Sequence, residues 1–161
     1  MSVSGFSYYF VIVGQSDNPL YELEYSTKGA DRNFDHRYLT QFVAHAALDL
    51  VEEHSWLTSQ MYLKCVDKFN EWFVTAFVGG TSKIKFLLVH NAPKIEENNI
   101  KNFFHEIYEL YTKFSMNPLY VHHTPIRSKI FEKKSINIAK KYNFVLLPKI
   151  ITVIKMLVVL S

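Results

Sequence analysis

The sequence predicts a three-layer α/β/α sandwich, in which helices cover both faces of a single sheet. Five strand-like and three helix-like segments follow one another in the order ββαβββαα. The central strand segments are apolar on both alternating faces, which is typical of strands covered on both sides. The chain has 161 residues, of which 48% are hydrophobic, with 13 Phe and 10 Tyr. This length and composition favour one folded domain and exclude a disordered chain.

The first two segments predict a β-hairpin. Residues 6–14 read FSYYFVIVG and carry apolar side chains on both alternating faces, so we expect a strand that helices cover on both sides. The turn signal Asp17-Asn18-Pro19 follows it. Residues 20–26 then alternate apolar side chains with Glu22 and Glu24. One apolar face and one solvent-exposed polar face indicate an edge strand that pairs with the first strand.

The first helix is predicted from Asp35, its N-terminal cap, to about Glu53. The side chains expected to face the sheet share a helical spacing; they are Leu39, Phe42, Val43, Ala46 and Leu50. A second apolar arc consists of Ala44, Leu48 and Val51. Two arcs indicate a helix that packs on two sides, so we expect the second arc to point outward and to contact a partner. The alternative is that the C-terminal tail of the same chain covers this arc.

The rest of the fold is predicted as a meander followed by two helices. Residues 61–67, 72–78 and 83–90 are strand candidates joined by short turns, which favours antiparallel pairing. The next helix is capped by Asn98 or Asn99 and ends at Pro118. Its apolar residues lie on one face; they are Ile100, Phe103, Phe104, Ile107, Leu110, Tyr111 and Phe114. A Thr124-Pro125 capping pair then predicts a third helix over 127–141.

The C-terminal part of the chain is strongly basic. From Arg127 onward it holds eight basic residues and one acidic residue, whereas residues 1–126 hold ten basic and fourteen acidic residues. This asymmetry indicates either an anionic partner, protein or membrane, or a solvated helix face. The apolar run 144–160 contains Lys149 and Lys155 and falls short of the roughly 20 residues that a bilayer span needs. We therefore expect a docked strand or helix or an atypical chain end, with a tail anchor as the alternative.

The sequence offers little chemistry. There is no glycine-rich phosphate loop, no HExxH and no pair of cysteines, so we expect no enzyme activity, no cofactor and no metal. His122 and His123 are adjacent, and neighbouring side chains in an extended loop point apart. Cys65 is in phase with the apolar residues of its strand, so we expect a small buried hydrophobe. A single cysteine, no secretory leader and a net charge of +3 favour a reducing, cytosolic setting and no nucleic-acid partner.

Long stretches of the chain resemble the sedlin family of small subunits of the TRAPP vesicle-tethering complex. The matching stretches, in order, are YYFVIVGQSDNPLYELEY, DHRYLTQFVAHAALDLVEE, MYLKCVDKFNEWFVTAFV, NIKNFFHEIYELYTKFSMNP and TPIRSKIFEKK. The resemblance covers roughly 6–141. It implies a longin-like (profilin-like) fold, an α+β arrangement with a five-stranded antiparallel sheet, one helix on one face and two on the other. We therefore expect a sedlin-like domain over 1–142 and an apolar tail over 143–161.

The resemblance also implies a function. Sedlin-like subunits are non-catalytic adaptors that join TRAPP subunits in transport from endoplasmic reticulum to Golgi. The complex activates a Rab GTPase, so the link of such a subunit to the GTPase is indirect. The implied location is cytoplasmic and perinuclear, in the endoplasmic reticulum–Golgi region, with peripheral membrane association through the complex. The alternative is a longin-type regulator of SNARE-mediated membrane fusion outside TRAPP, which needs a long heptad-repeat helix after the domain.

The candidate site lies on the first helix. Family longin domains commonly use this helix against partners, and the AHAALDL segment places His45, Leu48 and Asp49 there. Together with the second apolar arc, the predicted partner-binding residues are Ala44, His45, Leu48, Asp49 and Val51. His45 and Asp49 are one helical turn apart and are expected as a surface pair. Because a buried carboxylate needs a donor, we expect Asp49 to accept hydrogen bonds from its own chain or from a partner.

Overall fold

The computed structural model describes residues 7–26, 34–80, 83–91 and 96–142. In these ranges the elements follow the predicted order. Their bounds are β1 Ser7–Val13, β2 Pro19–Ser26, α1 Phe34–Leu57, β3 Tyr62–Phe69, β4 Trp72–Val78, β5 Lys85–His90, α2 Glu97–Ser115 and α3 Lys129–Lys141. The predicted apolar tail over 143–161 and any anchor in it lie outside the described residues.

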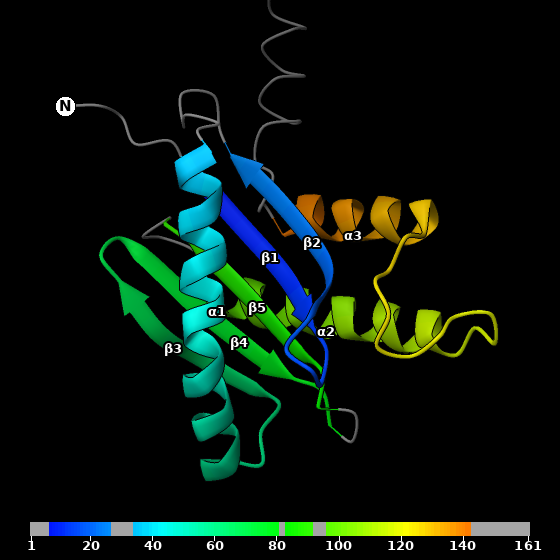
Figure 1. Cartoon of the computed structure of the whole chain (residues 1–161), viewed down its shortest axis with the longest axis horizontal. Coiled ribbons are helices and arrows are strands. Elements are labelled where there is room, and N and C mark those ends of the chain that lie inside the picture. The colour runs from blue at the N-terminus through cyan, green and yellow to red at the C-terminus, as the bar shows by residue number, and fades with distance from the viewer. Residues whose placement is uncertain (1–6, 27–33, 81–82, 92–95, 143–161) are drawn as a thin grey trace, which may run out of the picture.

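The five strands form one antiparallel sheet in the order β2-β1-β5-β4-β3 (Figure 1). The hairpin β1–β2 and the meander β3–β4–β5 are joined where β1 pairs antiparallel with β5, with Phe10 opposite Leu88. Helix α1 lies on one face, and α2 and α3 lie on the other (Figure 1). The predicted three-layer sandwich with a longin-like arrangement is therefore confirmed.

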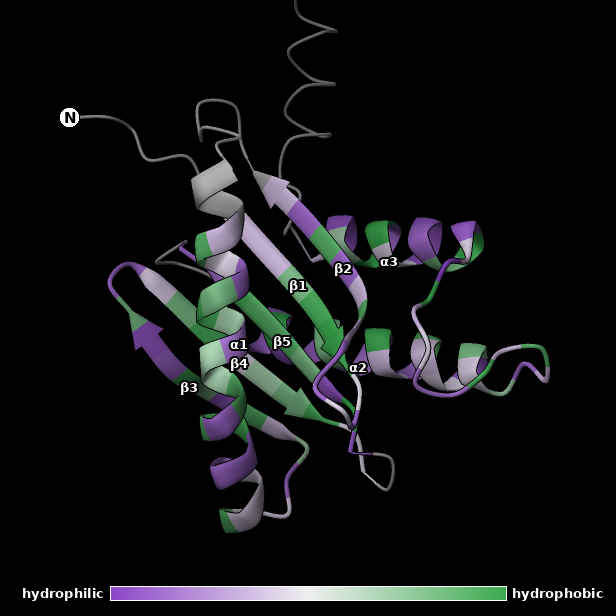
Figure 2. Ribbon diagram, in the orientation of Figure 1, coloured by the Kyte–Doolittle hydropathy of each residue, from purple (hydrophilic) through white to green (hydrophobic). Residues whose placement is uncertain are grey.

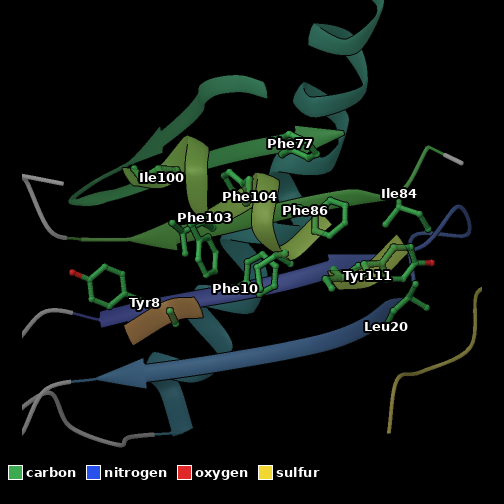
Figure 3. Packing of buried hydrophobic residues seen from close by; sticks show 14 of the residues in the cluster. Tyr8, Phe10, Leu20, Phe77, Ile84, Phe86, Ile100, Phe103, Phe104 and Tyr111 are labelled. Atoms are coloured by element: carbon green, nitrogen blue, oxygen red, sulfur yellow. The ribbon is translucent and has the colours of Figure 1, made fainter. Parts of the chain in front are cut away.

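Each face of the sheet has its own hydrophobic core. Alternation along β1 places Phe10 in the core under α2 and Val11 in the core under α1. The α2 side is rich in aromatic rings, several of which are shown in Figure 3. Phe10 meets Phe103 edge-on with ring centroids 5.2 Å apart, and Phe77 stacks on Phe104 at 5.8 Å. Such contacts between aromatic rings add to the stabilisation from burial alone.

Helix α3 packs beside the edge strand β2. Phe131 of α3 meets Tyr21 of β2 edge-on at 4.9 Å, and Ser135 shares a hydrogen bond with the Tyr21 hydroxyl. The predicted edge strand is confirmed, since Tyr21 packs inward while Glu22 and its neighbour Glu24 are exposed. In the described parts of the chain, no helix is long and apolar enough to cross a bilayer.

Three local predictions were wrong. Cys65 is exposed, because β3 carries two irregularities against β4 and Lys64 adopts a positive φ of 62°, which breaks the alternation of side chains. Helix α3 is capped by Ser128, whose hydroxyl accepts from the Phe131 N–H at 3.3 Å, and not by the Thr124-Pro125 pair. Helix α2 begins two or three residues earlier than predicted, after Glu96 and without a side-chain cap.

Candidate partner-binding surface

Helix α1 packs on the sheet through small and β-branched side chains. Its buried residues are Thr40, Val43, Ala44, Ala47, Leu48 and Val51. They recur at three- and four-residue intervals, so they form one face of the helix. The hydrophobic ones pack against side chains of β1, β3, β4 and β5, among them Val11, Val74 and Leu87. Ala47 and Val51 have no exposed surface, which places the centre of the buried face along the line that joins them.

The predicted inner and outer arcs of α1 are therefore interchanged. Ala44, Leu48 and Val51, which were expected to point outward, are buried against the sheet. Of the five residues expected to face the sheet, only Val43 is buried, while Leu39, Phe42 and Ala46 are exposed and Leu50 is half-buried. The physical reason is side-chain size. Alanines at 44 and 47 let the helix backbone approach the sheet closely, whereas a phenylalanine at 42 would hold it away.

The surface that α1 presents to solvent is the outer face, defined by Tyr38, Leu39, Phe42, His45, Ala46 and Asp49. Phe42 is 64% exposed and Tyr38 is 60% exposed, so two aromatic side chains in the N-terminal half of the helix stand largely in solvent. His45 and Asp49 are exposed beside it. Two of the predicted partner-binding residues thus lie on this face, and whether they contact a partner stays a prediction.

Asp49 makes no hydrogen bond or ion pair with any residue that the structure describes. The expected pairing with His45 is likewise not formed within these residues. The carboxylate is exposed, so water satisfies it and its solitary position costs the folded chain little. The internal donor that we considered for Asp49 is therefore not found in the described part of the chain, and a donor from a partner stays a prediction.

A hollow of about 200 Å³ adjoins the outer face, between α1 and the β1–β2 hairpin. From α1, Ala44, His45 and Leu48 are among the residues that line it. Across from them the Tyr9 hydroxyl donates to Glu22 Oε1 at 2.7 Å. Three of the five predicted partner-binding residues thus line this hollow, which the sequence did not predict. Asp49 and Val51 are not part of its lining.

The C-terminal end of α1 carries a second exposed apolar pair that the sequence analysis missed. Trp56 and Leu57 are 76% and 78% exposed. The Lys83 ammonium lies 5.7 Å from the centre of the Trp56 ring, a cation–π arrangement. The helix extends four residues beyond its predicted end at Glu53, and the apolar pair in that extension was the available signal.

The outer face of α1 offers groups that are suited to contact with another protein. In the described ranges, no three His, Cys, Asp or Glu side chains lie close enough together to hold a metal ion. The outer face instead combines aromatic side chains with one carboxylate and one imidazole. Aromatic side chains flanked by polar groups are typical of protein–protein contacts.

Comparison with known proteins identifies close relatives. The family model described as Sedlin matches residues 12–141. The chain is 56% identical over 137 residues to a Drosophila melanogaster protein named probable trafficking protein particle complex subunit 2, with 84% of this chain and 96% of that protein covered. A Caenorhabditis elegans protein of the same name is 44% identical, covering 84% and 95%. The transport protein particle 20 kDa subunit of Schizosaccharomyces pombe is 39% identical, covering 83% and 97%.

Proposed function

The chain belongs to the sedlin family, and from this premise we propose that it is a subunit of the TRAPP vesicle-tethering complex, acting in vesicle trafficking. Its relatives are named as subunits of the trafficking protein particle complex. The similarity spans the whole domain and nearly the full length of those relatives. The chain is accordingly a member of a hetero-oligomer with other TRAPP subunits.

Within that complex the chain is a non-catalytic adaptor. It contributes a contact surface and no reacting groups, and its link to a Rab GTPase runs through the other subunits. It works in the cytoplasm at the endoplasmic reticulum–Golgi boundary, and it binds no nucleic acid. The family membership supports these statements, as does the contact chemistry of α1.

The observation that carries the proposed contact is the outer face of α1. Phe42 and Tyr38 keep most of their surface in solvent on a helix whose opposite side is fully packed. Asp49 sits on the same face as a carboxylate without a partner among the described residues. A subunit that covers the aromatic side chains and donates to Asp49 would meet both features at once.

The test is recovery of TRAPP subunits with a tagged full-length chain that carries Phe42→Glu. A charge placed at the centre of an apolar contact is left without water or a partner, so we expect recovery to fall on the order of tenfold or more. The matched control is Phe69→Glu, at an exposed phenylalanine at the end of β3. The control should keep normal recovery, and thermal melts of both variants should match the wild type.

The possible outcomes distinguish the proposed adaptor contact from its alternatives. Equal recovery with Phe42→Glu and Phe69→Glu would place the contact elsewhere on the domain. Recovery of SNARE proteins in place of TRAPP subunits with the unaltered chain would favour the fusion-regulator alternative over the adaptor.

A further inference from the structure

The connection between α2 and α3 is a long loop that hydrogen bonds hold in place. The Ile126 N–H donates to the Leu20 carbonyl at 2.7 Å, and the Asn18 amide donates to the His123 carbonyl at 3.3 Å. Within the loop, the Tyr120 hydroxyl donates to the Thr124 carbonyl at 2.7 Å. These bonds tie the loop to the turn between β1 and β2, so its side chains are displayed from a fixed backbone.

The tied loop and the start of α3 expose apolar side chains to solvent. Leu119 is 89% exposed and Ile130 is 68% exposed, and Met116 and Val121 are exposed in the same way. The loop and the first turn of α3 lie at one end of the helical layer (Figure 1). Figure 2 shows hydrophobic residues at the tip of this loop and hydrophilic residues along α3. One end of the molecule thus combines apolar and charged surface.

The charged part is a basic ridge on α3. Helix α3 buries Phe131, Ser135 and Ala139 on one side. At 3.6 residues per turn, Lys129, Lys133 and Lys140 fall within about 40° of one another on the opposite side. They are exposed, and Lys129 and Lys133 form a like-charge pair one turn apart, which destabilises an isolated helix.

The ridge is also poor in compensating acids. Over residues 127–141 the chain has six basic residues and one acid, Glu132. Among the described residues, only Lys141 of these six forms an ion pair, with Glu106 at 2.6 Å. Lys129, Lys133 and Lys140 therefore keep their charge available to an external anionic surface.

We propose that the basic ridge along α3, together with the apolar tip of the α2–α3 loop, binds an anionic membrane surface directly. A phospholipid bilayer offers headgroup charge for Lys129, Lys133 and Lys140, and hydrocarbon for Leu119 and Ile130. Peripheral helices that bind membranes combine these same two features. An acidic protein is the competing occupant, and the vesicle and subunit-recovery measurements below distinguish it from a bilayer. In the sequence, α3 is followed by the apolar run 144–160 with Lys149 and Lys155, which has the same two chemistries.

The test is cosedimentation of the full-length chain with vesicles. One set contains phosphatidylcholine with about 30% phosphatidylserine, and the other contains phosphatidylcholine alone. We expect binding to the anionic set, weakening as salt rises from about 0.05 M to about 0.5 M because ions screen the attraction. Each basic residue near such a surface strengthens binding about fivefold, so Lys129→Gln with Lys133→Gln should weaken binding roughly 30-fold.

A matched control removes the same charge elsewhere. Lys64→Gln with Lys68→Gln alters two exposed lysines of β3, at the edge of the sheet far from β2 and α3, and should bind vesicles as the wild type does. Leu119→Ser should weaken binding severalfold without changing its salt dependence, because it removes apolar area and no charge. Thermal melts of all variants should match the wild type, since every altered side chain is exposed.

Three results would overturn the proposal. The first is equal binding to neutral and anionic vesicles, which would exclude a role for the basic ridge. The second is equal vesicle binding by the ridge and control double variants. The third is loss of TRAPP subunits from the ridge variant with vesicle binding unchanged, which would make the ridge a protein contact. Recovery of those subunits by the unaltered chain tests the proposed function separately, so either proposal can fail without the other.

Discussion

Helices α1 and α2 cover opposite faces of the same sheet, yet their sequences specify orientation very differently. In α2 the predicted apolar face is the observed one, with Phe103, Phe104 and Ile107 fully covered and the lysines and most glutamates outside. In α1 the predicted inner and outer arcs are interchanged. The difference teaches that periodicity locates a buried face only when the opposite face is polar.

Helix α1 has apolar residues on both sides because both sides serve as contact surfaces in our proposal. Its sheet side holds Ala44, Ala47 and Val51, and its solvent side holds Phe42 and Tyr38. Larger hydrophobes usually signal the core, and here they lie outside. Small side chains belong against the sheet, where the backbones approach each other closely.

The largest expected effect is on the free energy of unfolding, and it comes from comparing one leucine from each predicted arc of α1. Leu48→Ala should lower the free energy of unfolding by about 2–5 kcal/mol, because Leu48 is buried among the side chains over the sheet. Leu50→Ala, at a half-buried position at the border of the buried face, should cost clearly less, on the order of 1 kcal/mol. Chemical denaturation of both variants measures the two values. A larger loss for Leu50→Ala would restore the orientation that the sequence predicted.

Sequence reasoning succeeded wherever a local pattern and the global fold agree. Alternation along residues 7–13 and 20–25 fixed which side chains face each core, and the short turns fixed antiparallel pairing. It failed at Cys65, because a bulge shifts side-chain phase without a glycine or proline to mark it. It also failed at the start of α3, since Thr124 and Ser128 are both chemically competent caps. On α1 it found the helix and its two-sided character but not which side is which.

A smaller effect, on the α2 side only, is expected at alkaline pH. Burial is the main cause that raises the pKa of Tyr62 and of Tyr111 to about 12, and both belong to the core under α2. A raised pKa in the folded state means that their contribution to stability is complete below the unfolded value of about 10 and is lost as pH rises toward 12. Unfolding midpoints should therefore fall across this window. The double variant Tyr62→Phe with Tyr111→Phe should fall less, and an equal decline in both proteins would assign the effect to other groups.

The smallest expected effect on stability, and the one that bears most directly on function, is that of Asp49→Ala on the outer face of α1. The carboxylate is exposed and unpaired among the described residues, so the melting temperature should correspond to a change within about 0.5 kcal/mol. A hydrogen bond from a partner to a charged group contributes about 1.5–3 kcal/mol, so recovery of TRAPP subunits should drop on the order of tenfold or more.

Glu71→Ala, at an exposed carboxylate between β3 and β4, is the control and should change neither quantity. If Asp49→Ala also changes neither, Asp49 is a solvated charge and the contact rests on the aromatic residues alone. A large loss of stability would instead indicate a donor within the chain, among the residues outside the described ranges.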